Sequence, residues 1–316
     1  MNKTSIDYLT HTWNPLAMRC TKVSSACDHC WHLRMANRLA GSPAMSDEAR
    51  AAYRGEIGPV MTARLNNPLH RKKPAVIGVQ FMGDLFHEDV PDEFISNVWQ
   101  VMVEAHQHTF QVLTKRSGRM RKWVTAWYRR RCSDAIPNIW GLVTAENQEQ
   151  ADKRIPDLLA TKFAVRGVSC EPLLSEIDLT RYIECPFCAH AHTMPSGTLD
   201  CLCGHLLDWV IAGGETGPGA RPMPLNGARN LRDQCQAAGV SYFFKQHGEW
   251  LHFERRAKSS GGGYYHADNG KRLPIDEFID KPHEVHGDFG IARVGNKAAG
   301  HLLDGREWRQ MPGGEK

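Results

Sequence analysis

Three cysteines near the amino terminus have a spacing that suits metal chemistry. Cys20, Cys27 and Cys30 follow the pattern Cys-x6-Cys-x2-Cys. Three thiolates suit a cubane 4Fe-4S cluster with one iron left open, whereas a structural zinc site usually closes with four ligands. Because His29 or His32 could supply a fourth ligand, the spacing leaves an iron–sulfur cluster and a zinc site both open.

Four further cysteines lie close together in the second half of the chain. Cys185 and Cys188 are followed, after a loop of 12 residues, by Cys201 and Cys203. This arrangement resembles a zinc ribbon, and four thiolates complete a tetrahedral Zn²⁺ site that can fold a segment too short to bury its own core. We therefore predict structural Zn²⁺ in a small insertion at residues 183–207, with a second iron–sulfur cluster as the alternative. Cys170 and Cys235 stand alone and are expected to be buried thiols.

The elements that must position these cysteines alternate along the chain. Short apolar runs alternate with stretches of helical period, which is typical of βα units around a parallel sheet. Strands are predicted at residues 12–15, 75–81, 109–113, 138–143, 164–169, 209–212 and 241–244, and helices at 92–106, 148–159 and 227–238, with Gly239 as a C-terminal cap. The predicted fold class is α/β, a partial or full parallel (β/α) barrel over residues 1–250, with residues 251–316 as an extension packed on or tethered to it.

Polar residues stand at the carboxyl end of nearly every predicted strand. In barrel folds the loops at this end converge over the open mouth and bind ligands. The residues are Asp84, Lys115, Glu146, Glu171, Glu215 and Lys245. Any one of them could be polar merely because loops are wet, but their recurrence predicts a shared site. Lys115, Glu146, Glu171 and Lys245 are the candidates for substrate contact or catalysis.

A basic stretch follows the third predicted strand. Residues 115–131 contain eight Lys or Arg and no acid, interleaved with Trp123, Trp127 and Tyr128. The stretch is either a phosphate-binding face whose aromatic rings stack on bases, or a helix whose rings pack inward.

Composition limits the class of protein. The chain has 316 residues, of which 41% are hydrophobic and 23% charged, and a formal net charge of +4. This charge is too small to imply a nucleic-acid partner by itself. No apolar run approaches the ~20 residues of a membrane helix and no signal-type segment opens the chain, so we expect a cytoplasmic protein with no membrane partner. In that reducing compartment, ten cysteines favour metal sites over disulfides.

Five segments together resemble the phage Gp37/Gp68 family, a three-cysteine-motif family of unknown function found in phages and prophages. Besides the three cysteines, they are residues 12–15 (TWNP), 81–87 (FMGDLFH), 113–116 (LTKR), 169–174 (SCEPLL) and 213–222 (GGETGPGARP). The likeness runs from about residue 6 to 250 and resumes near 293–312. It implies a barrel similar to that of radical S-adenosylmethionine (SAM) enzymes, in the cytoplasm of a bacterial host.

The same resemblance implies a cofactor set and a reaction. Cys20, Cys27 and Cys30 would hold a 4Fe-4S cluster, SAM would chelate its open iron, and a reductase or flavodoxin-type donor would supply electrons. Gly83 and Asp84 occupy the place of the segment that receives the SAM amino group, although the cysteine spacing is six residues rather than three. The loop of Gly213, Gly214 and Glu215 is expected to cradle SAM, an anion or a ribose.

The sequence thus supports two functions. The favoured one is 5′-deoxyadenosyl radical chemistry, with a nucleic acid or a nucleotide as the candidate substrate. The alternative is a non-catalytic phage protein with zinc in both cysteine groups, binding nucleic acid or a host factor.

Overall fold

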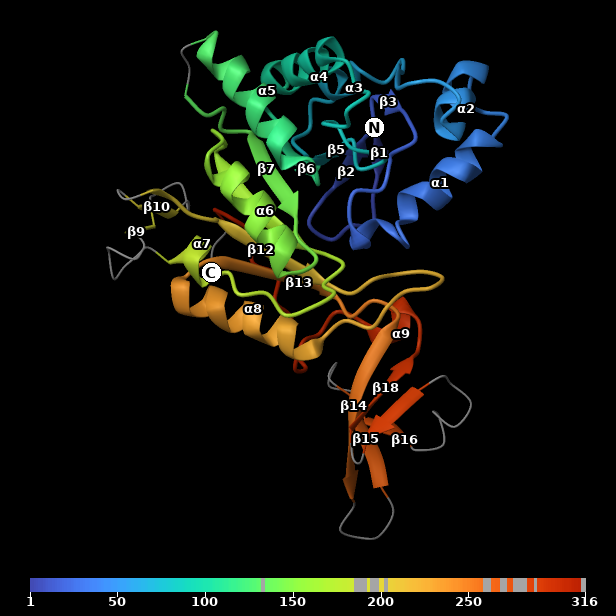
Figure 1. Ribbon diagram of the computed structural model, residues 1–316, viewed down its shortest axis with the longest axis vertical. Coiled ribbons are helices and arrows are strands. Elements are labelled where there is room, and N and C mark those ends of the chain that lie inside the picture. Colours follow the sequence, from blue (N-terminus) through green and yellow to red (C-terminus); the bar gives the residue numbers. More distant parts are fainter. Residues whose placement is uncertain are drawn as a thin grey trace.

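A large, mostly parallel sheet forms the body of the protein (Figure 1). The computed structural model describes residues 1–131, 134–184, 192–193, 199–201, 204–257, 263–267, 272–274, 283–286 and 289–313. The eight strands lie in the order β1-β2-β5-β6-β7-β8-β12-β13, and only the β1–β2 pair among them is antiparallel. Their bounds are Asn2–Lys3, His11–Trp13, Val76–Val79, Thr109–Thr114, Ile139–Thr144, Val165–Cys170, Trp209–Gly213 and Ser241–Gln246.

Four long helices cover one face of this sheet (Figure 1). They are α4 (Asp92–Glu104), α5 (Ser117–Arg129), α6 (Gln148–Leu159) and α8 (Leu225–Ala238). Each contributes buried side chains to one core shared with the strands, among them Trp99, Val124, Ile155 and Leu231. Because the parallel strands lie side by side in sequence order, each helix crosses from one strand to the next along the same face.

The opposite face of the sheet is filled by side chains from distant strands. Tyr8, just before β2, packs edge-on against Trp209 of β12 and Phe243 of β13, with ring centroids 5.5 Å apart in both pairs. Leu142 of β7 belongs to the same cluster. Contact between residues from the two ends of the strand order requires the sheet to curl.

A closed barrel is not seen among the described strands. The α/β class with a parallel sheet is confirmed, but β13 pairs with the chain's own carboxyl-terminal part on the side that closure would need. Phe244 N donates to Trp308 O at 2.7 Å, and Gln310 N donates to Tyr242 O at 3.1 Å.

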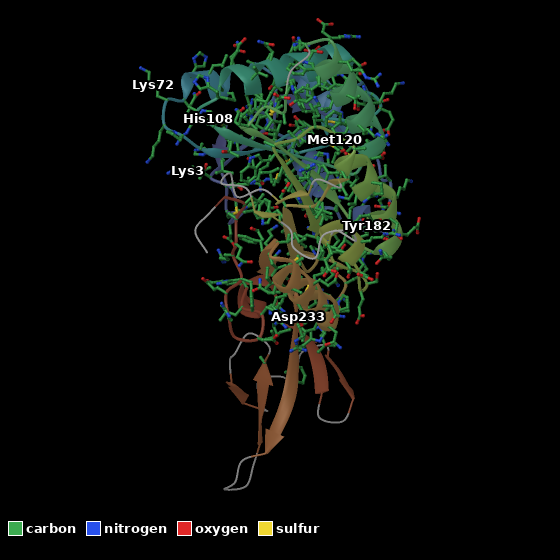
Figure 2. All side chains as sticks on the ribbon, turned by 90° about the vertical axis from the view of Figure 1, so that its left-hand side faces the viewer. Lys3, Lys72, His108, Met120, Tyr182 and Asp233 are labelled. Carbon is green, nitrogen blue, oxygen red and sulfur yellow. The ribbon has the colours of Figure 1, made fainter. Side chains whose placement is uncertain are left out.

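Three smaller sheets, the smallest of them the antiparallel pair β3–β4, and several short elements complete the described chain. The insertion contains β9 (His192–Thr193), β10 (Leu199–Cys201) and β11 (Gly204–His205). A five-stranded antiparallel sheet projects from one end of the molecule (Figures 1 and 2). Its strands are β14 (Trp250–Ala257), β15 (Gly263–Ala267), β16 (Arg272–Pro274), β17 (His283–His286) and β18 (Phe289–Arg293). The short elements are β3 (Leu16–Ala17), η1 (Ser25–Cys27), α2 (Asp47–Arg54), β4 (Val60–Met61), α3 (Asn67–His70), α7 (Thr180–Ile183) and α9 (Asn296–Ala299).

The main predicted elements all overlap observed ones. Helix α6 matches its predicted bounds, and Gly239 ends α8 with φ 70°, in the left-handed region expected of a glycine cap. Helix α1 (Trp31–Ala40) and α2 were not predicted as helices, and α5 agrees with one of the two alternatives left open for the basic stretch. Within the described chain, no helix combines the length and apolar character needed to cross a membrane.

The fold predicts a packing constraint at Gly141 of β7. A Cβ atom there would collide with the ring of Phe163. We expect Gly141→Ala to lower the free energy of unfolding by about 1–3 kcal/mol, because an overfilled core must shift. Gly58→Ala is the matched control, since nothing lies within 4 Å of its Cβ position. Equal urea midpoints for the two variants would contradict this packing.

Candidate functional site

A cavity of about 200 Å³ lies at the carboxyl ends of the parallel strands. It is lined by residues from the cysteine loop (residues 20–30) and by residues at or just after the ends of β5, β6, β7, β8, β12 and β13. Of the residues predicted from the sequence, it contains Cys20, Cys27, Cys30, Gly83, Asp84, Lys115, Glu171, Gly214, Glu215 and Lys245. The structure therefore brings nearly all predicted site residues to one place. Glu146 and Gly213 lie next to the cavity but do not line it.

The three thiols of the cysteine loop share this cavity without converging on one point. Cys27 is buried, Cys20 and Cys30 are half-buried, and all three are free thiols. Among the described residues, no three His, Cys, Asp or Glu side chains are grouped so as to hold a single metal ion. Burial raises the pKa of Cys20 to about 11, although the nearby Arg116 opposes this shift.

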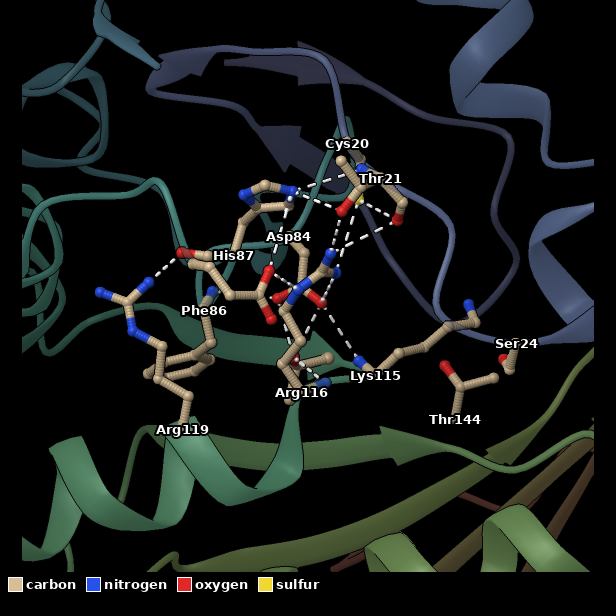
Figure 3. A network of polar contacts seen from close by, with 12 residues as sticks. Cys20, Thr21, Ser24, Asp84, Phe86, His87, Lys115, Arg116, Arg119 and Thr144 are labelled. Carbon is tan, nitrogen blue, oxygen red and sulfur yellow. Dashed lines mark hydrogen bonds and ion pairs between the residues drawn. The ribbon is translucent and has the colours of Figure 1, made fainter. Parts of the chain in front are cut away.

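A buried arginine–carboxylate pair ties the start of the loop to β5 and β6 (Figure 3). Asp84, 4% exposed, accepts hydrogen bonds from Thr114 Oγ1 at 2.7 Å and from Arg116 Nη1 at 3.2 Å. Arg116 Nη2 in turn donates to Thr21 Oγ1 at 2.8 Å, and Nη1 lies 3.6 Å from Cys20 Sγ. This pair holds Cys20 beside a fixed cation.

A second pair supports the middle of the loop from β7 and α6. Glu146 and Arg154 are almost fully buried, with Glu146 Oε2 3.0 Å from Arg154 Nη1. Glu146 Oε1 accepts from Ala26 N at 3.2 Å, while Arg154 Nη2 donates to Ser24 Oγ at 3.0 Å. Burial alone would raise the pKa of Glu146, but the Ser24 hydrogen bond and the Arg154 charge keep that pKa below its usual value.

A third pair reaches the loop from β12. Arg221 donates to both oxygens of Glu215, from Nη2 at 2.6 Å and from Nε at 2.9 Å. Its Nη2 also donates to Ser25 O at 2.8 Å. The preceding Gly214 is packed so closely that a Cβ atom would collide with the carbonyl of His247. The predicted glycine-rich loop therefore packs its backbone closely against that of His247, and this contact positions Glu215.

These three pairs, which we call the arginine braces, give three of the predicted site acids partners within the protein. Asp84 and Glu215 were predicted to bind SAM, and Glu146 to be a candidate for catalysis. In the structure their carboxylates accept hydrogen bonds from the protein, and these contacts require no ligand. Sequence reasoning placed the acids correctly but missed their arginine partners, because nothing in the spacing of Arg154 or Arg221 indicates a pair with the loop.

Gln80 was also missed by sequence reasoning. Its φ of 53° is unusual for a residue other than glycine. The buried side-chain amide of Gln80 donates to Leu16 O at 3.0 Å and to Met82 O at 2.8 Å. It thereby fixes the turn in which Gly83, with φ 129°, approaches the cavity.

The Glu171–Lys245 ion pair and the side chain of Lys115 also lie in the cavity and belong to none of the three braces. Glu171 Oε1 lies 2.6 Å from Lys245 Nζ, and both side chains are less than one-fifth exposed. Burial lowers the pKa of Lys245, but the Glu171 carboxylate outweighs this and raises that pKa above its usual value. The Lys115 ammonium lines the same cavity and has no hydrogen-bond partner in the described part of the chain.

The basic stretch forms helix α5, and its aromatic rings face the core. Trp127 and Tyr128 are buried, and the ring centroid of Trp123 lies 5.2 Å from that of Trp99. Of the two alternatives for this stretch, the structure therefore shows the helix whose rings pack inward, between helix and sheet. The exposed cations of α5, such as Arg121 and Lys122, remain on the outer surface.

The other cysteines divide into two groups. Cys170 and Cys235 are buried thiols as predicted, and burial raises the pKa of Cys170 to about 12. For the predicted zinc site, Cys185, Cys188 and Cys203 lie outside the described residues, and so does the side chain of Cys201 at the end of β10.

The second brace predicts a large difference between two Glu→Gln substitutions. Glu146→Gln leaves the buried Arg154 without a charged partner, and we expect a loss of about 3–5 kcal/mol in unfolding free energy. Glu88→Gln is the control. Glu88 also contacts a brace arginine, Arg116, at 2.7 Å, but is 64% exposed, so a loss of at most ~1 kcal/mol is expected. Similar urea midpoints for both variants would contradict a brace role for Glu146.

Comparison with known proteins places the chain in a family. No curated protein and no solved structure matches it. The family described as "Protein of unknown function (DUF5131)" matches residues 3–312, which is nearly the whole chain and includes every site residue described above. The chain therefore belongs to the DUF5131 family.

Proposed function

We propose that this chain is a radical-SAM-type enzyme of the phage Gp37/Gp68 kind, in which Cys20, Cys27 and Cys30 hold a 4Fe-4S cluster. The observation that carries the proposal is that all three thiols line one cavity with residues from the ends of six parallel strands. In parallel α/β folds this edge is where ligands bind. The curled sheet supports the finer assignment to a partial barrel.

The chemistry of the donor set suits a cluster. Each thiolate of a cubane binds a different iron, so the sulfurs need to share one cavity rather than meet around a single ion. The guanidinium of Arg116 beside Cys20 acts against the rise in the pKa of this thiol that burial causes, and iron binds the thiolate form. When bound, such a cluster supplies the electron that cleaves SAM into methionine and a 5′-deoxyadenosyl radical.

The chain's own residues position the reactants. Gly83 and Gly214 line the cavity, and their lack of a side chain lets Met18 and the His247 carbonyl pack directly behind the wall that a ligand would contact. Glu171 has an oxygen, Oε2, without a hydrogen-bond partner among the described residues, so it replaces Asp84 as the expected acceptor for a ligand ammonium or hydroxyl. Apolar side chains such as Phe81 and Leu113 line the cavity and exclude water around the reacting atoms.

A nucleic acid or a nucleotide remains the proposed substrate class. Its support is now the exposed cations of α5, since the aromatic rings of this helix are buried. A reductase or flavodoxin-type protein is the proposed electron donor, and the cytoplasm of a bacterial host the proposed location.

The cluster assignment predicts the metal content of cysteine variants. Cys20→Ala, Cys27→Ala and Cys30→Ala should each lose iron and the absorbance near 400 nm of anaerobically purified protein, because each removes one cluster ligand. Cys170→Ala is the control, since its thiol is buried outside the cavity. Iron retained in all three variants, or a colourless wild-type protein with two zinc ions, would refute the proposal and favour the non-catalytic zinc protein.

The insertion carries a separate prediction. If Cys185, Cys188, Cys201 and Cys203 bind structural Zn²⁺, Cys185→Ser and Cys201→Ser should release zinc and lower stability by several kcal/mol. Iron content should not change in either variant. Metal analysis with unchanged zinc, or zinc replaced by extra iron in the wild type, would contradict this assignment.

A further inference from the structure

The charges around the cavity are balanced with one exception. Each acid that lines it has its own cation: Arg116 for Asp84 at 3.2 Å, Arg221 for Glu215 at 2.6 Å, and Lys245 for Glu171 at 2.6 Å. Lys22, another lining residue, pairs with Asp28 at 3.3 Å. None of these groups carries an uncompensated charge.

Lys115 is the exception. Its ammonium lines the cavity, yet it makes no hydrogen bond or ion pair with any described residue. The backbone of Lys115 is fixed at the cavity, because its N–H donates to Asp84 Oδ2 at 3.2 Å (Figure 3). Its half-buried ammonium has no anionic partner of its own, so a ligand that enters the cavity can supply one.

Three hydroxyl groups in the cavity could also donate hydrogen bonds to a ligand. The hydroxyls of Tyr8, Thr144 and Ser169 belong to lining residues and have no hydrogen-bond partner among the described residues. A hydroxyl can donate to an anionic oxygen, as an ammonium does. The cavity therefore has one excess positive charge and several free O–H groups.

We propose that Lys115 is the anion-binding residue of the cavity and pairs with a carboxylate or phosphate of the molecule that enters it. The inference rests on the proposed function for the identity of that molecule. Two sources share this chemistry: the carboxylate of SAM and the phosphate of a nucleotide substrate. The charge balance described above counts Cys20, Cys27 and Cys30 as neutral thiols.

The test compares probes that differ in one anionic group. Calorimetry on the full, anaerobically purified chain would measure the affinities of SAM and decarboxylated SAM, and of adenosine 5′-monophosphate and adenosine. The variants are Lys115→Gln, which removes the charge, and Lys115→Arg, which keeps it. Lys22→Gln is the matched control, because it removes an ammonium from the same cavity that is already paired and is 55% exposed.

Lys115→Gln should weaken at least one anionic probe by about 10-fold to 150-fold, the effect of losing a charge-assisted hydrogen bond. The neutral counterpart of that probe should bind unchanged, and Lys115→Arg should keep most of the affinity. Loss for SAM alone identifies its carboxylate as the anion, and loss for the monophosphate identifies a phosphate-bearing substrate. Either result supports the proposal.

The proposal is overturned if Lys115→Gln and Lys22→Gln behave alike towards every probe. It is also overturned if the wild type binds neither anionic probe more tightly than its neutral counterpart. Unfolding curves would show that both variants are folded. Iron content, measured on the same samples, reports separately on the cluster: a chain without iron that still loses anion affinity in Lys115→Gln contradicts the proposed function and not this inference.

Discussion

The candidate site depends on the three arginine braces beneath the cysteine loop. Within this loop of residues 20–30, the described secondary structure is a single 3-10 turn, Ser25–Cys27. Contacts with the rest of the protein must therefore fix the conformation of the loop. Arginines 116, 154 and 221 each donate a hydrogen bond to it, and each is also paired with an acid that follows a strand. A buried ion pair adds little net stability, but a guanidinium fork fixes direction and distance. The braces thus serve to position the cysteine loop rather than to add net stability, and the position of the loop determines how its thiols face the cavity.

This arrangement links the fold to the chemistry. Parallel strands in sequence order bring their carboxyl ends to one edge, and the curl that packs Tyr8 against Trp209 and Phe243 turns that edge into a mouth. Acids at this mouth would repel one another and bind water if they were unpaired. Because each lining acid is paired with a cation, no carboxylate of the cavity wall is left unpaired. The cavity has a small excess of positive charge.

Much of this architecture can be predicted from the sequence, because local patterns determine it. The alternation of apolar runs located the parallel strands, and the polar residue after each strand located the mouth. What the sequence could not reveal was pairing across long distances: Arg154 reaches Ser24 across 130 positions, and Arg221 reaches Ser25 across 196. The inward direction of Trp123 and Trp127 on α5 was also ambiguous, since a basic, aromatic helix can bind phosphates or pack on a core. The return of Trp308 and Gln310 to the edge of β13 has no local signal at all.

We propose that the braced thiols hold a cluster with an iron open to SAM. Electron paramagnetic resonance of the anaerobically reconstituted and reduced protein, recorded with and without SAM, would detect both the cluster and its open iron. We expect the signal of a reduced 4Fe-4S cluster, and a change in its shape when SAM is added, because SAM would bind the open iron. A protein with no such signal, or a signal that SAM leaves unchanged, would contradict a cluster with an open iron at these thiols.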